Sequence, residues 1–153
     1  MALRLLLIAA VLALAPGCGL LGGARPGDGT VVEFERCTLT DGKVVPLAGA
    51  GGGKAVLLGY DGQAETTLPM LKKGRYELVV HGFAPSYDED AFFVTAGDQF
   101  EARVFFPNIN KLLATKPLTF KQEKDGPCKV TVVYAEDNVK LDRIVITPAK
   151  PAK

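Results

Sequence analysis

Residues 128–134, "CKVTVVY", carry the pattern that decides the fold, because apolar and polar side chains alternate along them. Residues 99–106, "QFEARVFF", alternate in the same way. Successive side chains of a β-strand point to opposite faces of a sheet, so this alternation is typical of a strand with one buried face. Both stretches therefore predict half-buried strands.

Further strand candidates follow one another along the chain. Turn residues separate them, as in "TDGK" (40–43), "YDGQ" (60–63) and "KDGP" (124–127). Residues 108–116, "NINKLLATK", allow a short helical turn but lack the length of a stable helix. Many short strands without a long helix predict an all-β domain, a β-sandwich of the jelly-roll type. The candidate strands are residues 31–39, 54–60, 64–70, 75–83, 91–96, 99–106, 116–122, 128–135 and 139–147.

The first residues have the features of an export signal. Arg4 precedes an apolar run from Leu5 to Ala15, which is shorter than the roughly 20 residues of a membrane span but fits a signal peptide. One cleavage pattern ends at Ala15. The other, "LAPGC", resembles a bacterial lipobox and predicts a signal peptide over residues 1–17, with Cys18 lipidated. The protein is then exported and anchored to a membrane of the bacterial cell envelope. Plain secretion, with Cys18 removed or unmodified, is the alternative.

Cysteine counting is consistent with a lipidated Cys18. The chain has three cysteines, and an odd number in an exported protein leaves one thiol to explain. With Cys18 as the anchor, Cys37 and Cys128 remain, and an oxidising compartment favours a disulfide between them. Such a bridge closes a long loop and stabilises by about 4 to 5 kcal/mol at most. Two buried thiols are the alternative.

Charge and composition define one domain between two polar segments. Without Arg4, 17 basic residues face 17 acidic ones. No basic patch stands out, so nucleic acid is not an expected partner. Residues 18–29 are a Gly-rich tether. Residues 30–148 are long enough for one domain with a real core, and residues 149–153 form a polar tail.

Residues 31–36, "VVEFER", place two acids inside a predicted strand. On a strand, Glu33 and Glu35 would point to the same face about 7 Å apart, where like charges repel. A solvated acidic face would explain them, and so would salt bridges from Arg36 or Arg143.

Five motifs in this order resemble the β-jelly-roll carbohydrate-binding modules of families 6 and 35, which are galactose-binding-like domains. The resemblance covers nearly the whole mature domain. It rests on "EFE" (33–35), "GGGKAVLLGYDG" (51–62), "KGRYELVVHGFA" (73–84), "SYDEDAFFVTAGD" (86–98) and "VKLDRIVIT" (139–147).

The resemblance implies a structural calcium ion. In those modules the first strand lies beside the last, and acids from both bind the ion. The matching ligands here are Glu33, Glu35 and Asp142, joined by a backbone carbonyl from residues 49–54. The chemistry is consistent, because calcium takes six to eight oxygen ligands.

The resemblance also implies a sugar site in loops at one end of the sandwich. Tyr60 matches an aromatic that flanks the sugar, and Asn138 matches an amide that binds it. The second aromatic is commonly Trp, which this chain lacks, so Tyr87 or Phe106 would have to take its place. The alternative for Tyr60 is a partly exposed structural tyrosine.

Two functional classes remain. The first is a lipid-anchored carbohydrate-binding protein that binds polysaccharide or glycan without catalysis. The second is an envelope structural or protein-interaction lipoprotein with the same fold and no sugar binding. An enzyme is not expected, because the single histidine, His81, lies in a predicted strand with no Ser or Cys motif nearby.

Overall fold

The computed structural model describes residues 29–97 and 100–150. Within them the chain is almost entirely β-structure, and no helix there is long and apolar enough to cross a membrane. The predicted signal peptide, most of the tether and Cys18 lie outside the described residues. The elements are β1 (Thr30–Glu33), η1 (Phe34–Arg36), β2 (Thr38–Pro46), η2 (Gly51–Gly53), β3 (Lys54–Leu71), β4 (Gly74–Phe83), β5 (Ala91–Ala96), β6 (Phe100–Phe105), β7 (Leu112–Ala114), β8 (Leu118–Gln122), β9 (Gly126–Tyr134) and β10 (Lys140–Pro148), where η marks a one-turn 3-10 helix.

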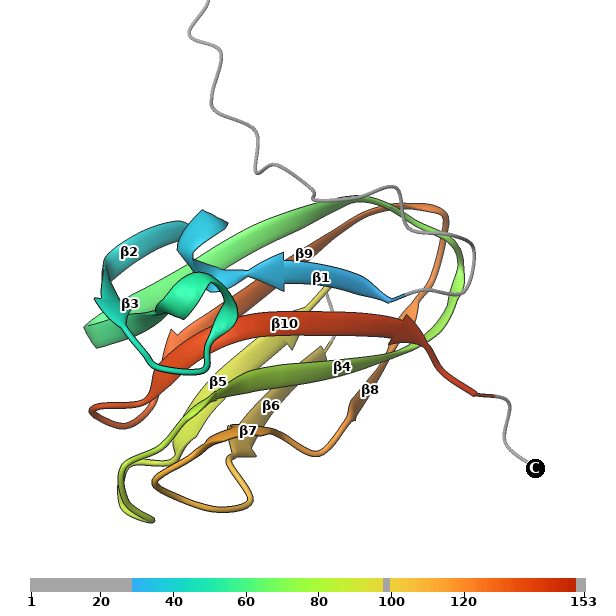
Figure 1. Ribbon diagram of the computed structural model, residues 1–153. Coiled ribbons are helices and arrows are strands. Elements are labelled where there is room, and N and C mark those ends of the chain that lie inside the picture. Colours follow the sequence, from blue (N-terminus) through green and yellow to red (C-terminus); the bar gives the residue numbers. More distant parts are fainter. Residues whose placement is uncertain (1–28, 98–99, 151–153) are drawn as a thin grey trace, which may run out of the picture.

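The strands form one curled antiparallel sheet that closes into a sandwich. Its order is β6-β5-β9-β3-β10-β4-β7, with β1 added to β10, β2 to β3 and β8 to β4. Figure 1 shows β1, β10 and β4 in front and β5 and β6 behind them. The all-β jelly roll predicted from the sequence is therefore confirmed.

The core lies between the two layers and is built by the alternation seen in the sequence. On β9, Cys128, Val130 and Val132 are buried whereas Lys129 is exposed. On β4, Leu78 and Val80 are completely buried. Burying one face of each strand is what fixes the register, because a slip by one residue would turn every apolar side chain outward.

The run 31–39 is not one strand, contrary to the sequence-based prediction. β1 ends at Glu33, η1 follows, and β2 begins at Thr38. The turn closes with the amide of Cys37 donating to the carbonyl of Phe34 at 3.0 Å. It places the Phe34 ring completely inside the core, so burial of this aromatic overrides the strand pattern.

β3 replaces the two predicted strands at 54–60 and 64–70. Leu58 pairs with Gly42 of β2 and Gln63 pairs with Thr40, so residues 59–62 bulge out opposite Asp41. The "YDGQ" turn signal thus marks a bulge within a continuous strand. A Cβ at Gly62 would lie 2.5 Å from the backbone carbonyl oxygen of Asp41, so the bulge requires glycine there.

Two other predictions differ from the structure. Residues 108–116 contain no helical turn and instead lead through β7. Within the described residues, no disulfide joins Cys37 to Cys128. Cys37 directly precedes β2 and Cys128 lies on β9, and β3 runs between these two strands.

Candidate functional site

The predicted calcium ligands meet where the last strand changes its neighbour. Glu33, the last residue of β1, pairs with Arg143 of β10. The ladder between β10 and β4 shifts register between Leu141 and Arg143. This irregularity falls on Asp142, whose side chain is completely buried.

Three carboxylate oxygens in this region have no hydrogen-bond partner. They are Oε2 of Glu33, Oε2 of Glu35 and Oδ2 of Asp142, and each is buried. The other Asp142 oxygen accepts a hydrogen bond from the amide of Gly51 at 2.7 Å. Arg143 offers partial compensation, with its Nη1 at 3.4 Å from Oδ2 of Asp142. Because unpaired buried polar atoms are costly, three together indicate a partner that satisfies them.

The glycine turn η2 covers these carboxylates. A Cβ at Gly51 would lie 2.7 Å from Oε2 and 3.0 Å from Oε1 of Glu33. A Cβ at Gly52 would lie 3.8 Å from Oε1 of Glu35, and Gly52 has a φ of +62°. Glycine therefore allows the backbone of residues 51–53 to approach the acids closely.

The surroundings of Glu33 disfavour its charged form. The pKa of Glu33 is raised by burial first and then by the charges of Asp142 and Glu35. Arg143 and Arg36 oppose the shift but do not cancel it. The salt-bridge alternative is thus confirmed for Arg143, which pairs with Asp142, while the pKa of Glu33 stays raised.

The donor set fits calcium, which prefers carboxylate and carbonyl oxygens. In the described residues, however, no group of three or more His, Cys, Asp or Glu side chains is arranged to hold a metal ion as it stands. Glu33, Glu35 and Asp142 are therefore candidate ligands by the chemistry of their side chains.

A second group of polar and aromatic residues forms the loop-end site, which we define as residues 59–62, 84–90 and 135–139. In Figure 1 the β4–β5 and β9–β10 connections lie on the left, where β3 also bends. The bulge exposes 79% of Tyr60. Its ring packs against that of Tyr134 with 5.5 Å between the centroids, and the Tyr134 hydroxyl donates to Asp137 at 3.0 Å.

Hydrogen bonds tie the two longer loops together. Asn138 donates its side-chain amide to Oε1 of Glu89 at 2.5 Å. Oε2 of Glu136 accepts from the backbone amides of Asp90 and Ala91 at 2.8 and 2.9 Å. Oε1 of the same residue pairs with Arg103 of β6 at 2.5 Å. The β4–β5 and β9–β10 loops therefore hold each other in place.

Three of the residues predicted to bind sugar lie in the loop-end site, whereas the fourth lies in the core. Tyr60 and Asn138 lie in this one loop cluster, and Tyr87 on the β4–β5 loop is 66% exposed. Phe106 is only 2% exposed and packs on Phe92 at 5.4 Å between centroids. Phe106 is therefore a core residue and cannot take the place of the missing Trp.

The sequence reasoning did not identify Tyr134, Glu89 or Glu136 as parts of this site. Tyr134 ends an alternating strand, a position that predicts a structural residue. The acids lie in loops, where solvated side chains are the usual expectation. Glu89 and Glu136 are identified only by the hydrogen bonds that join two loops 40 to 50 residues apart in the chain.

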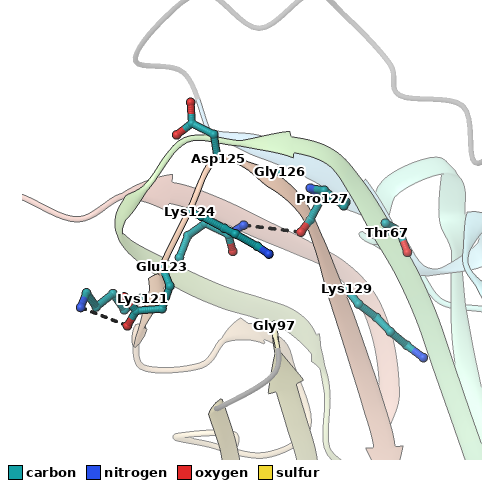
Figure 2. Close-up of a pocket in the computed structure, with 10 residues that line it drawn as sticks. Thr67, Gly97, Lys121, Glu123, Lys124, Asp125, Gly126, Pro127 and Lys129 are labelled. Atoms are coloured by element: carbon teal, nitrogen blue, oxygen red, sulfur yellow. Dashed lines mark hydrogen bonds and ion pairs between the residues drawn. The ribbon is translucent and has the colours of Figure 1, made fainter.

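A pocket of about 470 Å³ lies at the other end of the sandwich, between the β8–β9 connection and the Gly97 turn. Figure 2 shows Lys121 paired with Glu123 at its rim, 3.0 Å apart. Lys129 pairs with Glu65, and Asp125 pairs with Lys72. Since most of its charges already have partners and it lacks exposed aromatic rings, this pocket is not the candidate sugar site.

No protein-family model and no curated protein match the sequence. Solved structures do match the fold. A family 35 carbohydrate-binding module from Clostridium thermocellum superposes with a TM-score of 0.65 at 12% identity, over 79% of this chain and 98% of that module. The Podospora anserina β-(1,4)-mannanase with a family 35 module gives 0.70 at 18% identity, over 83% of this chain.

An exo-β-1,3-galactanase from Phanerochaete chrysosporium, solved with β-1,3-galactotriose, gives a TM-score of 0.66 at 20% identity over 78% of this chain. The chain spans only 29% of the galactanase and 29% of the mannanase. The matched parts of such enzymes are their carbohydrate-binding domains, and the family 35 modules that match along almost their whole length are non-catalytic. The described part of this chain therefore has the jelly-roll fold of the galactose-binding-like carbohydrate-binding modules, family 35 among them.

Proposed function

We propose that this chain is an exported, lipid-anchored protein whose jelly-roll domain binds glycan without catalysis. The single observation that carries the proposal is the exposed ring of Tyr60 on the 59–62 bulge. The ring of Tyr134 packs against it. The loops of Asn138 and Glu89 lie in the same site and are linked by a hydrogen bond. The fold shared with family 35 modules supports glycan binding in general.

The chemistry of the loop-end site suits a sugar. The apolar face of a pyranose ring packs on an aromatic ring, and a few fixed polar groups orient its hydroxyls. Tyr60 supplies the ring, and Tyr87 supplies a second exposed one. Asn138 uses one of its two amide hydrogens on Glu89, so its side-chain oxygen can accept from a sugar hydroxyl and its second N–H can donate to one.

The proposal includes a calcium ion that stabilises the fold. Glu33, Glu35 and Asp142 would hold the ion, together with a backbone carbonyl from residues 49–54. The support is the three buried oxygens that lack hydrogen-bond partners. The ion would stabilise the junction of β1 and β10 and take no part in sugar chemistry.

A glycan panel tests sugar binding. The full chain, kept in solution by detergent, is screened on neutral galactans, mannans, xylans and glucans with calcium present. Tyr60→Ala should abolish a hit and Tyr60→Phe should retain it, because the ring face makes the contact. Met70→Ala is the matched control, since Met70 is also exposed and on β3 but lies near that strand's other end. A hit that survives Tyr60→Ala would refute this site.

The second candidate function is a protein-interaction module. It is favoured by the absence of Trp and by the engagement of the Asn138 amide with Glu89. A blank panel from folded protein would select it over glycan binding.

Membrane fractionation tests the anchor. Wild-type protein should sediment with the envelope membranes of a bacterial host, and Cys18→Ser should be released in soluble form. Retention of Cys18→Ser in the membrane fraction would refute lipidation at Cys18.

A further inference from the structure

The loop-end site has a one-sided distribution of charge. Its three segments read "GYDG", "APSYDED" and "AEDNV". They contain six carboxylates and no Lys, Arg or His. The carboxylates are those of Asp61, Asp88, Glu89, Asp90, Glu136 and Asp137.

Neighbouring cations compensate only part of this charge. Arg103 pairs with Glu136. Lys140, the next residue after the β9–β10 loop, places its ammonium 5.2 Å from the centre of the Phe83 ring. In the described part of the chain, no ion pair is formed by Asp61, Asp88 or Asp137, and all three residues are exposed.

Two titrating groups in the site respond to the negative field. The pKa of Asp90 is raised by burial first and then by the charge of Glu136. The pKa of the Tyr134 hydroxyl is raised by desolvation first and then by Asp137. The carboxylates of Glu136 and Asp137 thus contribute to both upward shifts.

We propose that the loop-end site selects neutral or amino-bearing sugars and rejects glycans with carboxylate or sulfate groups, an inference that rests on the proposed function. Exposed charges act over about one Debye length, roughly 8 Å at physiological salt. A sugar stacked on Tyr60 lies within that distance of Asp61, which is next to it in the bulge. A sugar ammonium is then attracted, and a sugar carboxylate is repelled.

Matched oligosaccharides test the charge preference. Cellohexaose, its amino counterpart chitosan hexaose and its acidic counterpart cellouronate hexamer share one β-1,4-linked backbone. At 50 mM salt, the acidic member should bind at least about tenfold more weakly than the neutral one, and added salt should narrow the difference. Galacto- and manno-configured neutral and uronate oligomers are tested in parallel, so that the wrong backbone does not hide the effect.

Tyrosine fluorescence tests the field without a sugar. The chain has no Trp and four Tyr. The most exposed rings, Tyr60 and Tyr87, are both in this site. Caesium should quench this emission about twofold more efficiently than iodide, after each is normalised to N-acetyltyrosinamide, because a negative surface concentrates cations.

Charge-neutralising variants locate the effect. The double change Asp61→Asn and Asp88→Asn should bring the caesium-to-iodide ratio towards one and recover binding of the acidic oligomer. Glu123→Gln is the control, since it removes an exposed carboxylate at the opposite end of the sandwich and should change neither result.

The results distinguish failure of the charge preference from failure of glycan binding itself. Acidic oligomers that bind as tightly as neutral ones, or a ratio of one in the wild type, would overturn the charge preference and leave glycan binding intact. If no sugar of any charge binds while the caesium preference holds, the proposed function fails and this inference fails with it.

Discussion

Glu33→Gln is predicted to change the stability of the domain in opposite directions with and without calcium. In EDTA near pH 7, the Glu33 carboxylate is partly buried, lacks a partner for Oε2 and faces Asp142 and Glu35. Removing its charge relieves that repulsion, so the variant should melt at a higher temperature than the wild type. With calcium the order should reverse, because the variant loses one ligand of the ion.

The size of the calcium effect follows from linkage. A ligand present at one hundred times its dissociation constant stabilises the folded state by about 2.7 kcal/mol. For a domain of this length, about 4 °C of melting temperature corresponds to 1 kcal/mol. Saturating calcium should therefore raise the wild-type melting temperature by about 10 °C and raise that of Glu33→Gln much less.

The pH dependence gives an independent check in EDTA. The pKa of Glu33 is raised above its ordinary value of 4.5, so its protonated form is the one that favours folding. The melting temperature of the wild type should rise relative to that of Glu33→Gln as pH falls through the raised pKa towards 4.5. This relative rise should be lost as pH increases again. Differential scanning calorimetry at pH 4 to 8 measures both effects, with Glu123→Gln as the exposed control. Equal calcium shifts in wild type and Glu33→Gln would refute the assignment of Glu33 as a ligand.

Three further changes test other parts of the structure. Phe34→Ala should lower the free energy of unfolding by about 3 to 5 kcal/mol in urea titrations, because it empties a fully buried site; a loss below 1 kcal/mol would show that η1 does not anchor the core. Glu136→Ala should leave two backbone amides of the β4–β5 loop without their acceptor and cost about 1 to 3 kcal/mol, with faster hydrogen exchange confined to that loop; unchanged exchange would contradict the link between the loops. Peptide mapping without reductant should recover Cys37 and Cys128 in separate peptides, because β3 runs between the strands beside them; a peptide that links the two cysteines would contradict this strand order.

The fold was predictable from the sequence because each buried strand repeats its own pattern. The alternation at 128–134 reports directly on which side chains point inward, and the structure buries Cys128, Val130 and Val132 accordingly. The break after Glu33 was not predictable in this way. It depends on how deeply Phe34 inserts between the layers, which is a property of the packed core and not of the local pattern.

For the calcium and sugar sites, the sequence could predict which residues take part but not which way each side chain points. The family resemblance groups Glu33, Glu35 and Asp142, and in the structure each of the three has one buried oxygen without a hydrogen-bond partner. The same resemblance offers Phe106 as a sugar-flanking ring, but this side chain fills the core. Residue type and order do not determine whether an aromatic side chain at the end of a strand points into the core or towards solvent.

The bulge at residues 59–62 separates the exposed Tyr60 ring from the inward-facing residues of the same strand. On one side of it β3 pairs with β2 through Leu58, and on the other side through Gln63. Extra residues placed between these pairs would lengthen the projection that carries Tyr60 without moving an inward-facing side chain out of register. The domain can therefore acquire a longer or differently shaped contact surface at this point while its core stays the same, which makes the bulge the natural position at which to engineer a new specificity.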